Sequence, residues 1–519
     1  MALNVTSHSL YPIWLLTSGP NQDSSCFYVS MHRNRASMCS SLFIRSAFRN
    51  VPKSDSRIKL KVDLPEGCQA RQGTIEKFFR LISPNPSHPA GDISDTELAT
   101  LAYLSSYFKA SGILHDLCSL FEKRDFDFCR LESLMAAAKA SKDGELFDVA
   151  LQMILKNCIQ VPKEFEEKAK FYLEEIFQFS PVIKSWTNSL TVVPDWVIAA
   201  ILSKNVQIES LKLCAEALSF PLELAPHVQS LDLSFRNFPN WKHLDPFTTL
   251  KALNLKGTNI KSLVPLLNLK HLESLNLERC KDWSDLKTLS GLKNIKKLDI
   301  SDTEVSDLSF LENLSLTEFS AAGCRNISDF SKIETQVALQ KLNVENTFFV
   351  SLNFNALPSL SSLNLSGTSL DSIESLPNLM LTDLKLRRCS INHAALSRFE
   401  NLESLSIGTD IPSLDFITQL KKLKFLSIGN AHLNDAYKIG TCTNLESLHL
   451  FNITTNALDF IPNLLHLTEL TINICDIKEN FFPLLIELPD IKKITVTGNR
   501  HSTEQFVETL KARGVTVSC

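Results

Sequence analysis

The sequence predicts an α/β fold in which a solenoid with a parallel β-sheet follows an α+β domain and a short helical segment. One pattern recurs from residue 208 to residue 491: an apolar residue, two variable residues, Leu, one variable residue, then Leu or Ile. The first two hundred residues lack this pattern, so we expect a separate domain there. The predicted parts are residues 1–125, 126–205 and 206–519.

The composition excludes several classes of function. Lys and Arg together number 53 against 57 Asp and Glu, which gives a formal net charge of -4. Such a balance argues against binding to nucleic acid or to a membrane surface as the main function. Gly contributes only 15 of 519 residues, whereas phosphate-binding loops need glycine. No run of 18 apolar residues occurs, so no membrane-spanning segment is expected.

The cysteines predict neither a metal site nor a disulfide framework. There are 13 of them, an odd number, and no C-x-x-C pair occurs. A reducing compartment suits such scattered thiols, and we therefore expect a cytoplasmic protein without metal or cofactor.

The repeated pattern predicts a stack of short parallel strands. It occurs fourteen times at steps of 20 to 24 residues, for example at Leu360, Leu363 and Leu365. The Leu-x-Leu alternation is typical of a strand with one buried face, and stacked copies bury these faces in one continuous core. The pattern resembles the leucine-rich repeat, and the short step resembles the internalin-type subclass of about 22 residues.

Small residues follow the repeated pattern, and they predict a hydrogen bond between neighbouring turns. Cys280, Cys324 and Cys389 occupy this position in three copies, and threonines occupy it in others. We favour a structural role for these thiols over a reactive one. A helix over residues 503–513 and a strand over 515–517 are expected to cover the C-terminal end of the stack.

The residues between the leucines are expected to line the concave face. Ser and Gly form a floor in two neighbouring copies. Aromatic and basic residues, typical of binding hot spots, are predicted to border this floor on opposite sides. They are Phe425, His449 and Phe451 on one side and Lys385 and Arg387 on the other. The alternative is an ordinary solvated face with an occasional aromatic residue.

The N-terminal part is predicted to begin with a β-hairpin. Its strands are Pro12–Thr17 and Cys26–Met31, followed by a strand at Ile58–Val62 and a helix at Thr74–Ile82. The pattern from Ser94 to Glu97 is a capping box that opens a further helix.

Over residues 11–122 this order resembles a BTB/POZ domain. The resemblance is carried by the spacing of characteristic residues: His32, Ser40, Phe43, Ala102, Tyr103, Leu104, Leu114 and Cys118. Helices predicted at 131–141 and 144–155 resemble the BACK-type extension that follows such domains. Further helices are expected at 163–177 and 196–203. His115 and Cys118 lie three residues apart, but two ligands do not make a metal site, so we expect Cys118 to pack in the core.

No catalytic motif occurs in context, and we expect no enzyme. The sequence has no G-x-G-x-x-G, no G-x-x-x-x-G-K-[ST], no H-E-x-x-H and no G-x-S-x-G. A cysteine ubiquitin-ligase domain after the repeats is not expected, because about twenty residues follow the last copy.

The two resemblances together imply a protein-protein interaction adaptor. In that class the BTB domain holds the cullin scaffold of a cullin-RING ubiquitin ligase or forms a homodimer, while the second domain binds a target protein. The internalin-like repeats imply a bacterial effector in the cytosol of a host cell as the alternative location. The alternative function is a non-enzymatic scaffold or inhibitor that binds one protein and has no link to ubiquitin.

Overall fold

A computed structural model describes fifteen ranges of the chain. They are residues 10–19, 22–32, 58–63, 71–81, 93–188, 193–213, 221–236, 241–283, 285–370, 372–376, 380–409, 411–455, 458–473, 481–497 and 504–518. The chain divides into two compact units, Met1–Val228 and Gln229–Cys519, which are described separately. The predicted division into residues 1–125, 126–205 and 206–519 stays a prediction.

The first unit begins with a three-stranded sheet in the order β2-β1-β3. The strands β1 (Leu10–Gly19) and β2 (Gln22–His32) form an antiparallel hairpin, and β3 (Ile58–Asp63) pairs with β1 in parallel. The predicted hairpin and third strand are therefore confirmed. His32 is the last residue of β2, whereas Ser40 and Phe43 lie outside the described residues.

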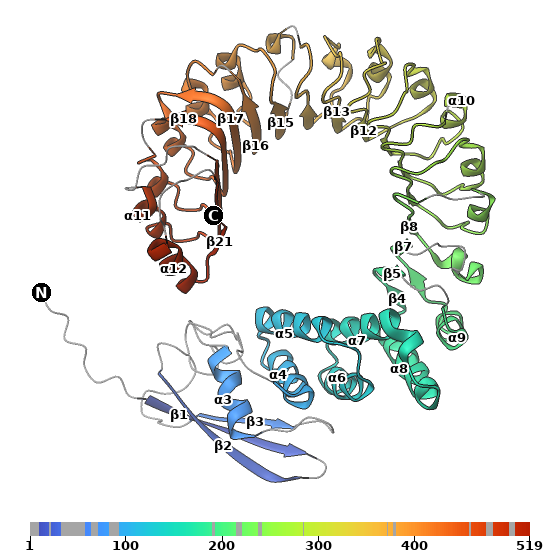
Figure 1. Ribbon diagram of the computed structural model, residues 1–519, viewed down its shortest axis with the longest axis vertical. Coiled ribbons are helices and arrows are strands. Elements are labelled where there is room, and N and C mark those ends of the chain that lie inside the picture. Colours follow the sequence, from blue (N-terminus) through green and yellow to red (C-terminus); the bar gives the residue numbers. More distant parts are fainter. Residues whose placement is uncertain are drawn as a thin grey trace, which may run out of the picture. The chain divides into compact units, whose positions relative to one another are not determined.

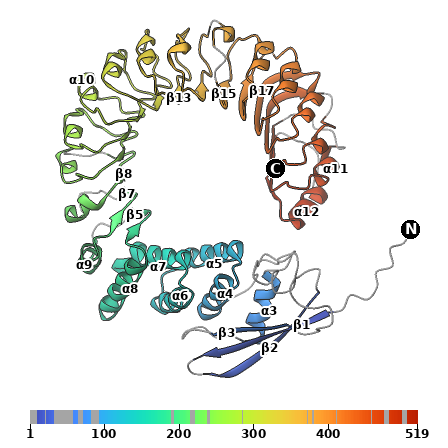
Figure 2. The same ribbon diagram turned by 180° about the vertical axis from the view of Figure 1, so that it is seen from behind.

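Seven helices of at least nine residues are described in the first unit, at or near the positions that the sequence predicts. Ser94 caps α4, since its hydroxyl oxygen accepts a hydrogen bond from the backbone N–H of Glu97 at 3.2 Å. The helix α3 lies beside the three-stranded sheet (Figure 2). The helices are α3 (Gln72–Leu81), α4 (Asp95–Tyr107), α5 (Ser111–Lys123), α6 (Phe128–Ser141), α7 (Gly144–Asn157), α8 (Glu166–Phe179) and α9 (Asp195–Ser203).

A carboxylate with two arginine partners ties α4 to the segment after α5. Asp95 accepts hydrogen bonds from Arg124 Nη1 at 2.6 Å and from Arg130 Nε at 2.7 Å. Burial alone would raise the pKa of Asp95, but the two guanidinium groups outweigh it and hold the pKa below its usual range.

The repeat begins one copy earlier than the sequence pattern predicts. The strand β5 (Trp186–Asn188) pairs in parallel with β7 (Leu211–Leu213), and Trp186 lies opposite Leu211. The short strands β4 (Val182–Ile183) and β6 (Gln207–Ile208) pair in the same sense. Trp186 is buried and fills the position of the first strand leucine, so this copy lacks the leucine of the repeated pattern.

The second unit is a curved stack of parallel strands, with one strand in each predicted copy of the pattern after the first, whose strand β7 lies in the first unit. Its strands line the inner side of an arc, and short helices, most of them 3-10, lie on the outer side (Figure 1). The strands are β8 (Ser230–Asp232), β9 (Ala252–Asn254), β10 (Ser274–Asn276), β11 (Lys297–Asp299), β12 (Glu318–Ser320), β13 (Lys341–Asn343), β14 (Ser362–Asn364), β15 (Asp383–Leu386), β16 (Ser404–Gly408), β17 (Phe425–Leu433), β18 (Ser447–Thr455), β19 (Glu469–Asn473), β20 (Lys493–Thr497) and β21 (Thr516–Ser518).

The core of this stack is a ladder of leucines in register. Leu342 of β13 lies opposite Leu363 of β14, which in turn lies opposite Leu384 of β15, and all three are buried. The predicted C-terminal helix and strand are confirmed as α12 (Glu504–Ala512) and β21.

The turn cysteines join neighbouring copies, as predicted. The thiol of Cys280 donates to the carbonyl oxygen of Leu255 at 2.9 Å, and that of Cys324 donates to Ile300 at 3.0 Å. Cys389 makes the same contact with Leu365 at 2.9 Å. Burial raises the pKa of the Cys280 and Cys324 thiols, which keeps them protonated as donors.

We expect the turn cysteines to resist alkylation in the folded protein. Cys280 and Cys324 are buried and protonated, whereas Cys129 is exposed on α6. Site-resolved mass spectrometry after iodoacetamide treatment should find Cys129 modified first and the two turn thiols modified only in urea. Labelling of all three at one rate in the folded protein would contradict their structural role.

Replacement of Asp95 by Asn should destabilise the helical segment by about 1–3 kcal/mol at neutral pH. Because the pKa of Asp95 is lowered by folding, its contribution is complete above the unfolded pKa and is lost as pH falls through the folded pKa. Urea midpoints of wild type and D95N, monitored by helical circular dichroism, should therefore differ most at pH 7 and converge in acid. The exposed Asp116→Asn is the control, and an equal effect at both sites would refute the prediction.

Candidate functional site

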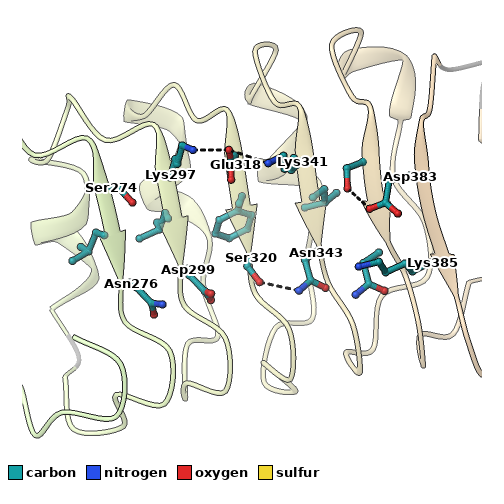
Figure 3. A pocket seen from close by; sticks show the side chains of 16 residues that line it. Ser274, Asn276, Lys297, Asp299, Glu318, Ser320, Lys341, Asn343, Asp383 and Lys385 are labelled. Atoms are coloured by element: carbon teal, nitrogen blue, oxygen red, sulfur yellow. Dashed lines mark hydrogen bonds and ion pairs between the residues drawn. The ribbon is translucent and has the colours of Figure 1, made fainter. Parts of the chain in front are cut away.

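Charged side chains on the inner side of the second unit form pairs between adjacent copies. Lys256 contacts Glu278 at 2.7 Å, and Lys493 contacts Glu469 at 2.7 Å. Glu318 lies between two lysines, Lys297 at 2.8 Å and Lys341 at 3.3 Å (Figure 3). These cations are thus neutralised by the protein itself.

The pairs around Glu318 belong to a polar hollow of about 350 Å³ that extends from β10 to β15. Burial alone would raise the pKa of Glu318, but the hydrogen bonds from the two lysines lower it below its usual range. Ser320 accepts a hydrogen bond from Asn343 Nδ2 at 3.1 Å in the same hollow (Figure 3). The polar groups there largely satisfy one another.

The arrangement changes at β15, where two basic side chains lack such partners. Lys385 lies in β15 and Arg387 directly follows it, and both are exposed. Within the described ranges neither forms an ion pair. Arg387 Nη2 donates to Ser427 Oγ of β17 at 2.5 Å, and its guanidinium carbon lies 5.6 Å from the centre of the Phe451 ring.

Three rings of β17 and β18 meet beside this guanidinium. The ring of His449 contacts Phe425 edge to face at 5.0 Å between centroids and Phe451 at 5.8 Å. Nε2 of His449 also lies 3.2 Å from Ser447 Oγ. Burial lowers the pKa of His449, so the neutral ring is the dominant form at neutral pH.

Small residues make room for the reach of Arg387 across the sheet. Ser406 and Gly408 in β16 lie between Arg387 and β17, and Ser427 and Gly429 lie next to them. A Cβ atom on Gly408 would lie 2.6 Å from the carbonyl oxygen of Gly429, so Gly408 is required by packing. A Cβ atom on Gly429 would make only an ordinary van der Waals contact, 3.6 Å from the carbonyl oxygen of Phe451, so a methyl group fits there.

The structure places the predicted patch residues differently from the expected arrangement. Arg387 and the rings were expected on opposite borders of the Ser and Gly floor, but the Arg387 side chain crosses the floor, and its guanidinium lies within cation–π distance of Phe451. Phe425, His449 and Phe451 do cluster. Ser427, the partner of Arg387, was predicted only as floor, because its role depends on the length of a side chain two strands away.

Some residues of the BTB-like pattern lie in the core, and others lie outside the described part of the chain. Tyr103 and Cys118 are buried in α4 and α5. His115 is exposed and contacts Glu145 at 3.0 Å, so it does not form a site with Cys118. Among the described residues, no group of three His, Cys, Asp or Glu side chains is arranged to hold a metal ion. Within the described ranges of the chain, no helix is long and apolar enough to cross a bilayer.

Alanine at the two floor glycines should change the free energy of unfolding differently. G408A forces a contact with the Gly429 carbonyl and should lower the free energy of unfolding by about 1–3 kcal/mol. G429A finds space and should be neutral or slightly stabilising. Urea midpoints of both variants against wild type measure this difference. Equal midpoints would show that β16 and β17 are not as close as described.

Comparisons with known proteins give matches of limited extent. A family model, the LRR domain of endo-beta-N-acetylglucosaminidase EndoS, matches residues 293–392. The disease resistance protein RML1A of Arabidopsis thaliana is 29% identical over 177 residues, which are 32% of this chain and 17% of that protein. The chain thus spans about a sixth of the length of this curated relative.

Two bacterial structures are also similar. An internalin of Listeria monocytogenes is 23% identical with a TM-score of 0.42, covering 55% of this chain and 90% of its own. A leucine-rich-repeat protein of Leptospira interrogans is 18% identical with a TM-score of 0.42, covering 66% and 97%. The repeated pattern, the parallel strand that each copy forms and the matching family model agree on one architecture. The chain carries a leucine-rich-repeat solenoid.

Proposed function

We propose that the chain is a protein-binding molecule whose concave face holds its target at the patch formed by Lys385, Arg387, Phe425, His449 and Phe451. The observation that carries this proposal is that Lys385 and Arg387, beside half-buried rings, form no ion pair with any carboxylate among the described residues. On other copies of the concave face, Lys256, Lys297 and Lys493 each contact a glutamate. Arginine and aromatic side chains together are typical of binding hot spots.

The contacts of Arg387 suit a binding role, because they hold its side chain in place before a partner arrives. Arg387 is oriented by a hydrogen bond and by ring stacking, so little side-chain freedom remains to be lost on binding. The ring of His449 contacts two phenylalanines, which suits an apolar contact surface.

We further propose that the N-terminal residues 1–125 form a BTB-like module that makes the chain an adaptor. The support is the hairpin β1-β2 with β3 parallel to β1, followed by α3, α4 and α5. Such a module holds the cullin scaffold of a ubiquitin ligase or pairs two copies of the chain, in the cytoplasm of its own cell or of a host. A target on the concave face would then be held close to the ligase.

The second candidate is a scaffold or inhibitor that binds one protein and recruits no ligase. The internal pairing of charges along β9 to β13 favours it, because a largely self-satisfied concave face leaves one localised patch for a partner.

Truncation of the two phenylalanines should weaken target binding roughly 30-fold or more. In F425A/F451A the His449 ring loses both edge contacts and the Arg387 guanidinium loses its stacking partner. Hot-spot losses of 2 kcal/mol or more are typical, and they correspond to a roughly 30-fold weaker affinity. Affinity purification of the full chain from eukaryotic cytosol, with quantitative mass spectrometry, measures the change.

The matched control is Phe348→Ala, which removes an exposed phenylalanine from a turn outside the patch. It should leave every partner in place. If F425A/F451A retained all partners of the wild type, the patch would not be the target site.

The adaptor proposal is tested by the same purification of the full chain. Chemical cross-links from a co-purified cullin should map to residues 1–125 and should persist in F425A/F451A. Recovery of a target without any cullin or RING component would leave the scaffold or inhibitor as the function.

A further inference from the structure

We propose that the patch recognises an extended peptide segment of its partner that carries an Asp or Glu carboxylate next to a large apolar side chain. This inference rests on the proposed binding function and names the chemistry of the partner. The carboxylate would contact Arg387 and Lys385, and the apolar side chain would lie against Phe425 and Phe451.

The guanidinium of Arg387 has hydrogen-bond donors to spare. It carries five N–H groups, of which the described hydrogen bond to Ser427 uses one on Nη2, and its carbon lies 5.6 Å from the centre of the Phe451 ring. The side chain is exposed, so further N–H groups reach solvent. A planar guanidinium fixed in this way binds a carboxylate through two parallel hydrogen bonds.

The positive charges of Arg387 and Lys385 favour an anionic group on the partner. Lys385 lies two residues away on the same face, and neither cation has an ion pair within the described part of the chain. The nearest carboxylate on that strand, Asp383, accepts a hydrogen bond from Ser362 at 2.8 Å (Figure 3). An anionic group of the partner would therefore supply the neutralisation that Glu278, Glu318 and Glu469 supply elsewhere.

The floor of the patch is covered by the protein itself, because Ser406 and Ser427 are buried and Arg387 donates to Ser427. A bound segment would therefore lie on the exposed Arg387 side chain and on the half-buried rings. At Gly429, which is half-buried, no side chain obstructs it. The ring of Phe425 on the same strand and that of Phe451 on the next strand would contact the apolar residue.

The first test uses a library of random 12-residue peptides displayed on phage and selected on the full chain. We expect enriched peptides to contain Asp or Glu within two positions of Leu, Ile, Phe or Trp. One enriched peptide is then synthesised with a fluorescent label, and its Kd is measured by fluorescence anisotropy.

Charge-removing variants locate the carboxylate. Arg387→Gln should weaken the peptide by about tenfold or more, as expected for a hydrogen bond to a charged group. Lys385→Gln should weaken it less, and a peptide with Gln in place of its acid should lose the effect of Arg387→Gln. Arg388→Gln is the matched control, since it removes the same charge one residue further on, at an exposed turn position.

The outcomes separate this inference from the proposed function. Peptides that need Phe425 and Phe451 but show no acidic preference would overturn the inference and leave the binding function standing. Failure to select any peptide sensitive to the patch would overturn the inference, while partner loss in F425A/F451A would still support the function. A phosphoserine peptide that binds more tightly than its glutamate counterpart would replace the carboxylate by a phosphate.

Discussion

Every other feature of the second unit depends on the stacking of short strands whose apolar face cannot be buried by one copy alone. Leu342, Leu363 and Leu384 lie opposite one another, and each covers the next. Each copy therefore gains its stability from its neighbours, as in other repeat architectures. The turns add a second connection, since the thiols of Cys280 and Cys324 donate to the carbonyl oxygen of the preceding copy. A thiol serves there because it is small and, when buried, keeps its proton.

In this sheet the residues between the buried leucines of each strand form the concave surface, and their spacing is set by the strands. From β9 to β13 that surface is largely occupied by its own contacts, of which Glu318 with its two lysines is the clearest case. At β15 the same geometry leaves a guanidinium without a carboxylate and directs it onto an aromatic ring. The two regions differ in which residues occupy equivalent positions, so one scaffold carries both a self-satisfied face and the patch for which we propose binding.

Much of the fold could be predicted from the sequence, because a buried leucine at a fixed spacing has one structural meaning. The first copy was missed for a physical reason: Trp186 fills the leucine position and Asn188 ends the strand, so the pattern is absent although the pairing is present. In the patch, the clustering of Phe425, His449 and Phe451 follows from alternation along adjacent strands. The path of Arg387 does not, since it depends on the small size of Ser406 and Gly408 on the strand that it crosses.

The span of Arg387 has an evolutionary consequence. Repeat proteins change length by gaining or losing whole copies, and a copy inserted into a regular stack folds on its neighbours. A copy added between β8 and β14 would lengthen the arc and leave the patch unchanged. One added between β15 and β17 would carry Arg387 away from both Ser427 and Phe451 by a full strand spacing, about 4.8 Å, and one added between β17 and β18 would separate it from Phe451 alone. The contacts of Arg387 thus require the four copies from residue 381 to residue 466 to stay consecutive, whereas they set no limit on the number of copies before them.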